Sequence, residues 1–122
     1  MAYYYSFRGW LEVEPDNFSR IIEVVRSQQA SHAKNSKLGL YSQGWCWSEN
    51  PINWTRYLFY GADLTKEGLD FFQELLETIT RMGLYVSGYF HAQGEDGEEN
   101  VVYKVVDDML YVEEDVPKVE IT

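Results

Sequence analysis

Two stretches of the chain carry apolar residues at helical spacing, and segments with the two-residue alternation of β-strands lie before, between and after them. The helical stripes comprise Phe18, Ile21, Ile22 and Val25 in the first stretch and Leu69, Phe72, Leu76 and Ile79 in the second. Asp16 is a suitable N-cap for a helix over 16–29, and Thr65 is a suitable N-cap for a helix over 66–82. Gly83 then favours a helix end. Half-buried helices of this kind need a sheet or another helix to cover them.

Strand-like alternation recurs along the rest of the chain. The predicted strands are 2–14, 38–49, 54–63, 84–93, 100–106 and 109–113. The polar residues 27–37 are predicted to form a loop, Gly9 a bulge in the first strand, and Asp107-Asp108 a tight turn. The order is strand, helix, two strands, helix and strand, followed by a hairpin. It resembles a ferredoxin-like βαββαβ plait of the α+β class with an added C-terminal hairpin. The resemblance implies an antiparallel sheet with both helices on one face.

The length and composition predict one folded domain over residues 1–122, with residues 95–122 as its hairpin extension. Aromatic residues make up 16% of the chain, which is far more than disordered chains carry. The single cysteine, Cys46, excludes an internal disulfide and a zinc site built on several cysteines. Its position in a predicted strand suggests a small side chain packed under the helices.

The charge excludes several kinds of partner. Twenty acidic residues against ten basic ones give a net charge of −10, which disfavours direct contact with nucleic acid or with an anionic membrane surface. No apolar run approaches the roughly 20 residues of a membrane span. The N-terminal residues lack the pattern of a signal peptide, so the expected location is the cytoplasm.

Motifs of catalysis are missing from the sequence. It contains no dinucleotide-binding or Walker glycine pattern, no zinc-protease motif and no nucleophile elbow. His32 and His91 are isolated, and the acidic turn 95–99 lacks the alternating oxygen positions of a calcium loop. We therefore expect no catalytic residue, no metal and no cofactor.

Acidic residues are concentrated at the C-terminal end. Residues 1–94 carry a net charge of −2, whereas residues 95–122 carry −8. One interpretation is protection of an exposed sheet edge against pairing with other chains. The other is a negative surface that attracts a basic partner. The acidic candidates for partner binding are Glu95, Asp96, Glu98, Glu99, Asp107 and Asp108.

Aromatic residues are also in surplus for a core of this size. The alternation in 38–49 predicts that Tyr41, Trp45 and Trp47 point away from the helices, onto an open sheet face that Tyr89 shares. Tyr4, Trp10 and Tyr85 are further candidates for that face. Trp45, Trp47 and Tyr89 would then be anchors for a protein partner. Two alternatives are that the register is inverted and that the hairpin or tail covers this face. An RNA-binding plait is disfavoured because few lysines and arginines accompany the aromatic residues.

A small, acidic, aromatic-rich α+β chain without catalytic motifs resembles the bacterial immunity proteins of contact-dependent growth inhibition and related polymorphic-toxin systems. The resemblance implies a tight one-to-one complex with a cognate basic toxin of the nuclease class, whose active site or substrate surface is blocked. These immunity proteins share no single motif, so no site residue is transferred. The alternatives are a non-enzymatic adaptor and an effector-sensing αβ plait that acts as a dimer. The sequence leaves monomer and dimer open.

Overall fold

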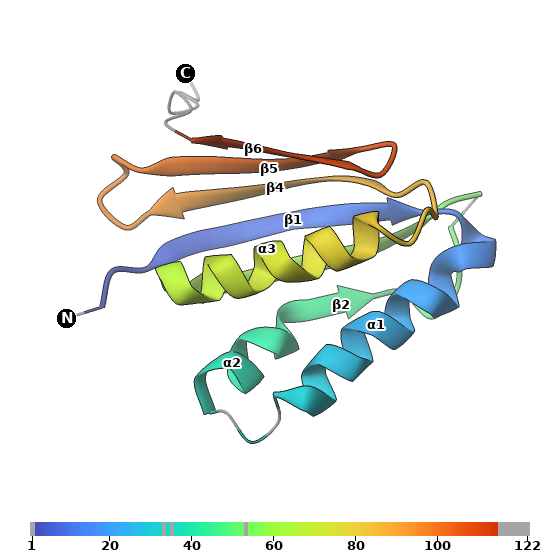
Figure 1. Cartoon of the computed structure of the whole chain (residues 1–122), viewed down its shortest axis with the longest axis horizontal. Coiled ribbons are helices and arrows are strands. Elements are labelled where there is room, and N and C mark those ends of the chain that lie inside the picture. The colour runs from blue at the N-terminus through green and yellow to red at the C-terminus, as the bar shows by residue number, and fades with distance from the viewer. Residues whose placement is uncertain (1, 33, 35, 53, 115–122) are drawn as a thin grey trace.

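The structure is a computed structural model that describes residues 2–32, 34, 36–52 and 54–114. In these residues, three α-helices accompany one six-stranded antiparallel sheet in the order β2-β3-β1-β4-β5-β6 (Figure 1). The elements are β1 Tyr5–Val13, a 3-10 turn Pro15–Asn17, α1 Phe18–Ser31, α2 Ser36–Tyr41, a 3-10 turn Ser42–Gly44, β2 Trp45–Trp47, β3 Arg56–Leu64, α3 Lys66–Thr80, β4 Ser87–Gly94, β5 Asn100–Val106 and β6 Met109–Glu114.

The predicted α+β class and antiparallel sheet are confirmed. The ferredoxin-like plait is not confirmed, because such a plait has four strands and this sheet has six, with a third helix, α2, before β2. The hairpin of β5 and β6 continues the sheet beside β4. All four residues of the second apolar stripe lie on α3 and are buried against the sheet. Thr65 caps this helix, because its side chain accepts a hydrogen bond from the Gly68 amide.

One hydrophobic core joins α1 and α3 to a single face of the sheet. Phe7 lies at its centre, with its ring centroid 4.5 Å from that of Phe72 on α3 and 5.6 Å from that of Phe90 on β4. Gly9 is not a bulge, because β1 pairs with β3 and β4 in unbroken register through this residue. A side chain on Gly9 would collide with the backbone of Tyr89 and with Phe90. The glycine therefore lets Phe90 fill the space above β1.

The prediction for residues 27–49 is wrong in two places. The helix α1 continues to Ser31, and a second helix, α2, occupies residues that were expected in a strand. Gln29 on α1 donates a hydrogen bond to the Ser42 carbonyl, with 2.9 Å between Nε2 and O, which ties the end of α1 to the turn after α2. The Tyr60 hydroxyl likewise donates to the Tyr41 carbonyl at 2.6 Å. Tertiary contacts of this kind override a local strand pattern.

The orientation of β2 is also opposite to the expected one. Trp45 is 7% exposed and stacks on Phe72 in the core, with 5.3 Å between ring centroids. Cys46 is exposed and pairs with Phe59 on the other side of the sheet. The prediction of a buried Cys46 and an outward Trp45 is therefore wrong, because side chains alternate and one inversion exchanges the two faces.

The β5–β6 turn lies beside the start of β4 and is hydrogen-bonded to the residues before that strand. The predicted tight turn is confirmed, since Asp107 and Asp108 both have left-handed backbone conformations, with φ of 46° and 66°. β4 begins only at Ser87, later than predicted, because the Asp108 carboxylate accepts hydrogen bonds from the amides of Tyr85 and Val86 at 2.8 and 2.9 Å. These bonds hold residues 84–86 outside the strand.

Candidate protein-binding face

The sheet has one face that no described helix covers, and aromatic side chains cross it in a continuous row. The strand registers place one residue from each of the six strands side by side in this row. We call it the open-face row, and in spatial order it comprises Cys46, Phe59, Trp10, Tyr89, Lys104 and Tyr111. Four of the six side chains are aromatic. Such a row on a solvent-facing surface is unusual, because solvated sheet faces are normally polar.

Several rings on the open face contact one another and are exposed to solvent. Trp10 and Tyr89 have ring centroids 5.6 Å apart, and Phe59 stacks on Tyr57, the residue two positions earlier in β3, at 5.9 Å. Trp10 is 41% exposed, Phe59 49% and Tyr111 48%. The connection between β2 and β3 extends this apolar surface through Ile52 and Trp54, both of which are more than 70% exposed. Contiguous exposed apolar surface of this kind marks interaction sites.

The charged side chains on the open face are few, and several have partners within the chain. Lys104 forms an ion pair with Glu113, with 3.3 Å between Nζ and Oε1. Arg8 donates hydrogen bonds to Ser6 and to Gln93. The His91 ring nitrogen Nε2 lies 2.9 Å from the Asn100 side-chain oxygen. The face therefore offers neutral aromatic surface at its centre.

The acidic turn between β4 and β5 is partly structural. The Tyr3 hydroxyl donates to Asp96 Oδ1 at 2.6 Å, the Glu98 amide donates to the same oxygen at 2.9 Å, and the Tyr5 hydroxyl donates to Glu99. The hydrogen bond from Tyr3, together with that from the Glu98 amide, lowers the pKa of Asp96. The same bond is the largest cause of the raised pKa of Tyr3. Glu95 and Glu98 keep exposed side chains that are available to a partner.

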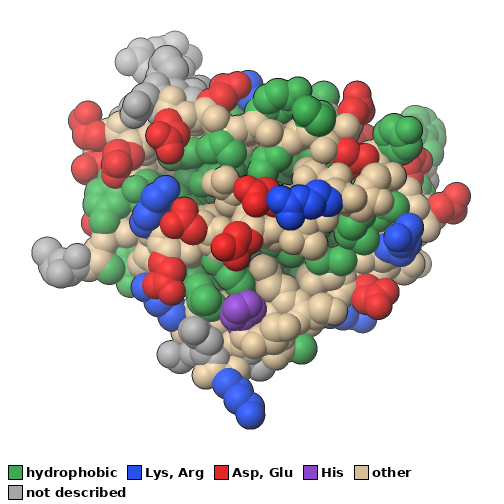
Figure 2. Space-filling view, viewed as in Figure 1, with side chains coloured by type: hydrophobic (Ala, Val, Ile, Leu, Met, Phe, Trp, Pro, Cys, Tyr) green, Lys and Arg blue, Asp and Glu red, His purple; other side chains and the backbone are tan. Residues whose placement is uncertain are grey.

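The six acidic candidates do not form one patch. Glu95, Asp96, Glu98 and Glu99 lie at the end of the sheet where β4 joins β5, and Asp107 and Asp108 lie at the opposite end of β5 (Figure 1). A seven-residue strand separates the two groups by roughly 20 Å or more. Glu113 and Glu114 of β6 pair with the start of β5 and so lie toward the first group. Figure 2 shows acidic side chains gathered at that end of the molecule.

The three aromatic candidates have three different environments. Tyr89 lies on the open face, as predicted, in contact with Trp10. Trp45 lies in the core, and Trp47 is partly buried on the helix side of the sheet, near Arg26 of α1. Only Tyr89 of the three is therefore placed to anchor a partner on the open face.

Sequence reasoning missed most of the exposed aromatic side chains on and around the open face. Tyr57, Phe59, Tyr111 and Trp54 were not among the candidates, although each is exposed. A signal was present in β3, where Tyr57-Leu58-Phe59-Tyr60 is apolar on both faces. A strand of that composition is typical of a sheet covered on both sides. In this chain, α1 and α3 cover one face of the sheet, and no described residue covers the other face.

No group of three or more histidine, cysteine, aspartate and glutamate side chains in the described part is placed to hold a metal ion. None of the described helices has the length and apolarity needed to cross a membrane.

Comparison of the sequence with protein-family models found no match, and searches of curated proteins and of solved structures found none either.

Proposed function

We propose that this chain is a non-enzymatic immunity protein that binds a basic toxin domain, of the nuclease class, through its open sheet face. The observation that carries the proposal is the open-face row, in which exposed aromatic rings from neighbouring strands form a surface that the described chain does not cover. Tryptophan and tyrosine are the side chains that most often anchor protein interfaces. A domain with such a surface reaches a lower free energy when a partner removes these rings from water.

The charge of the chain supports a basic partner. The net charge is −10, and the carboxylates of the β4–β5 turn stand at the edge of the open face. Concentrated negative charge accelerates association with a positive surface. Aromatic rings also attract lysine and arginine side chains through their electron-rich faces. Anchoring and attraction therefore favour the same class of partner.

A nuclease fits this chemistry because its substrate-binding surface has to neutralise phosphate groups. An acidic protein competes with nucleic acid for such a surface. Occupation of the surface blocks hydrolysis without any catalytic group on the inhibitor. We propose that the complex forms in the cytoplasm, where the nucleic acid substrates of such a toxin are found.

We also infer that part of the chain is a ferredoxin-like core with additions. The four strands β2-β3-β1-β4 are adjacent and antiparallel, and α1 and α3 share a hydrophobic core with one face of them. On this interpretation, α2 and the β5–β6 hairpin are the added elements. The hairpin widens the open face by the strand that carries Tyr111.

The test of the function is protection and binding with a defined toxin. The chain is co-expressed with the product of the neighbouring gene as the candidate toxin, growth is followed, and the purified proteins are mixed and analysed by size-exclusion chromatography with light scattering. We expect restored growth and a one-to-one complex. Phe59→Ala should weaken the complex, whereas Leu40→Ala, at an exposed position on α2, should not.

Two outcomes would contradict the immunity proposal. A chain that dimerises through the open face, and loses the dimer in Phe59→Ala without binding the toxin, would indicate an effector-sensing plait. A chain that remains monomeric and neither binds the toxin nor restores growth would indicate an adaptor for another assembly.

A further inference from the structure

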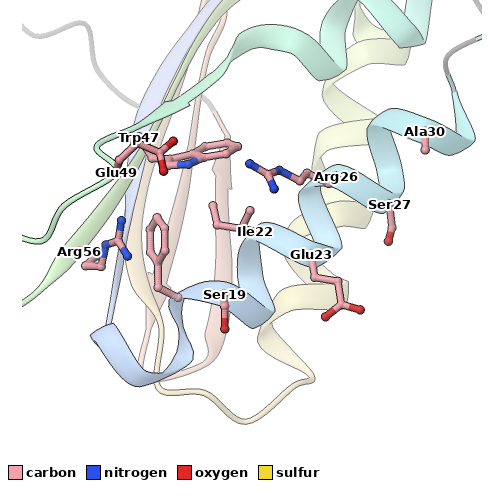
Figure 3. Close-up of a pocket in the computed structure, with 10 residues that line it drawn as sticks. Ser19, Ile22, Glu23, Arg26, Ser27, Ala30, Trp47, Glu49 and Arg56 are labelled. Atoms are coloured by element: carbon pink, nitrogen blue, oxygen red, sulfur yellow. The ribbon is translucent and has the colours of Figure 1, made fainter.

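A groove lies on the helix side of the sheet, away from the open face. It runs between α1 and the residues around the β2–β3 connection and encloses about 560 Å³ (Figure 3). Its apolar lining consists of Phe18, Ile22 and Ala30 from α1 and Trp47 from β2, and serine, glutamate and arginine side chains make up the rest. Pockets for small ligands have volumes of roughly 300–1,000 Å³ and largely apolar walls. The groove therefore has the size of a small-molecule site, and its open lining is partly apolar and partly polar.

Two arginines line this groove, and aromatic rings position both of them. The guanidinium carbon of Arg26 lies 5.6 Å from the centre of the Trp47 ring, and that of Arg56 lies 3.6 Å from the centre of the Phe18 ring. Arg56 is held further by a hydrogen bond from Nη2 to the Ser48 carbonyl at 2.6 Å. In Figure 3 the Arg26 side chain extends toward the Trp47 ring, and Ile22 lies between the two arginines.

Both arginines lack a carboxylate partner among the described residues. Within the described part of the chain, neither Arg26 nor Arg56 lies within 4.0 Å of an acidic oxygen, although acidic residues outnumber basic ones by twenty to ten. Glu23 and Glu49 also line the groove, but Glu23 points away from the Trp47 ring (Figure 3). Two guanidinium groups thus keep donors that an anion can use.

We propose that this groove binds a small organic anion with an apolar body, either a carboxylate or a phosphate monoester. The charged end of the ligand lies in the positive field of Arg26 and Arg56, whose planar donors match carboxylate and phosphate oxygens. Its apolar body lies on Trp47, Phe18 and Ile22. Glu23 and Glu49 disfavour negative charge elsewhere on the ligand, which restricts the class to molecules charged at one end. The site is independent of the open face and does not depend on the proposed toxin complex.

The experiment titrates the full chain with defined probes and follows the indole N–H and backbone amide signals by two-dimensional nuclear magnetic resonance. The probes are 3-phenylpropionate and phenyl phosphate, with 3-phenylpropanol as the uncharged analogue and inorganic phosphate as the anion without an apolar body. We expect saturable shifts at Trp47 for at least one of the two organic anions, and at least tenfold weaker binding of both the alcohol and inorganic phosphate. The stronger organic anion identifies the charged group.

Variants separate the groove from general charge effects. Arg26→Gln and Arg56→Gln should each weaken binding at least tenfold, and Arg20→Gln, on the same helix but outside the groove, should not. Thermal unfolding of each variant shows whether it is folded. If Arg56→Gln does not fold, Arg26→Gln alone decides the test, because Arg26 is exposed and its replacement is not expected to disturb the fold. Equal binding of 3-phenylpropanol, unchanged binding in Arg26→Gln, or no saturation below about 10 mM for both anions would overturn the proposal.

Discussion

Trp10 and Tyr89 are direct neighbours across the β1–β4 ladder, with 5.6 Å between their ring centroids, on the face of the sheet opposite the helices. Their neighbours on β1 and β4, Leu11 and Phe90, are fully buried on the other face. The central strands are therefore apolar on both sides. Among the described residues, helices cover only one of these sides, and the Trp10–Tyr89 pair lies on the other.

The first prediction concerns this pair. Trp10→Ala and Tyr89→Ala should each weaken binding of the basic partner by about 2 kcal/mol, roughly 30-fold in Kd, as expected for anchor residues. The double variant should lose less than the sum of the two, because the rings contact each other. Isothermal titration calorimetry measures all three affinities, with Leu40→Ala as the control. Full affinity in both single variants would exclude the centre of the open face as the interface.

The second prediction separates electrostatic attraction from structure in the acidic turn. Glu95→Lys with Glu98→Lys should slow association with the partner, and the effect should shrink as the salt concentration rises above about 0.15 M. The thermal stability should change little, because both side chains are exposed. Surface-binding kinetics at low and high salt measure the association rate.

The control for this double charge reversal is Glu23→Lys with Glu74→Lys, which changes two exposed acids on α1 and α3, on the helix side of the sheet. An equal decrease in the association rate in this control would show that only the total charge matters. Reversal of Asp96 and Glu99 is unsuitable for the test, because their carboxylates accept hydrogen bonds from Tyr3 and Tyr5.

The third prediction follows from the hydrogen bonds to Asp96. They lower its pKa in the folded chain, so its contribution to stability is present above the unfolded pKa of about 3.9 and is lost as the pH falls below that value. Asp96→Asn keeps an acceptor oxygen but does not titrate. Its stability should therefore fall less than that of the natural chain between pH 5 and pH 2, as measured by urea unfolding. Glu95→Gln is the control, since that carboxylate accepts no hydrogen bond from the described residues. Identical pH profiles for Asp96→Asn and the natural chain would contradict the prediction.

Most of the fold could be predicted from the sequence where the pattern was long. The stripe of α3 extends over four turns, and the alternation of β1 runs through nine residues, so each has one consistent interpretation. The hairpin turn at Asp107-Asp108 was predictable because aspartate tolerates left-handed backbone better than most residues. Local chemistry was sufficient in these places.

The sequence was insufficient to predict the local structure and the side-chain orientation between residues 27 and 49. The spacing of Tyr41, Trp45 and Trp47 fits a strand, but Tyr41 belongs to a short helix that is fixed by contacts with Tyr60 and Gly68. β2 has only three residues, too few for alternation to indicate which side is buried. Its orientation depends on the space beside Phe72 and Phe90, which Trp45 fills. That space is created by residues distant in sequence.

The fourth prediction concerns alkaline pH. Burial raises the pKa of Tyr60 and raises that of Tyr103 to about 12. The contribution of these phenols to stability is complete below the unfolded pKa of about 10 and is lost as the pH rises toward the folded values. The free energy of unfolding should therefore decrease above pH 10, and Tyr103→Phe should reduce that decrease. Phenolate absorbance should rise in two phases. A single phase near pH 10, with Tyr103→Phe identical to the natural chain, would contradict this.

The last prediction concerns the glycine that allows the central strands to pack. A Cβ atom on Gly9 would meet the Tyr89 carbonyl oxygen and lie 2.6 Å from the Phe90 Cα, so Gly9→Ala has to displace β4 or the Phe90 ring. We expect a loss of about 1–3 kcal/mol in the free energy of unfolding, the usual effect of overpacking a core. Gly61→Ala is a matched control in β3, because a Cβ atom there meets nothing within 4 Å. It should be neutral or stabilise the chain by up to about 1 kcal/mol, since alanine restricts the unfolded chain more than glycine does. Urea unfolding of both variants measures the difference. Equal stability of the two variants would mean that β1 and β4 are not in the close contact on which the Trp10–Tyr89 pair depends.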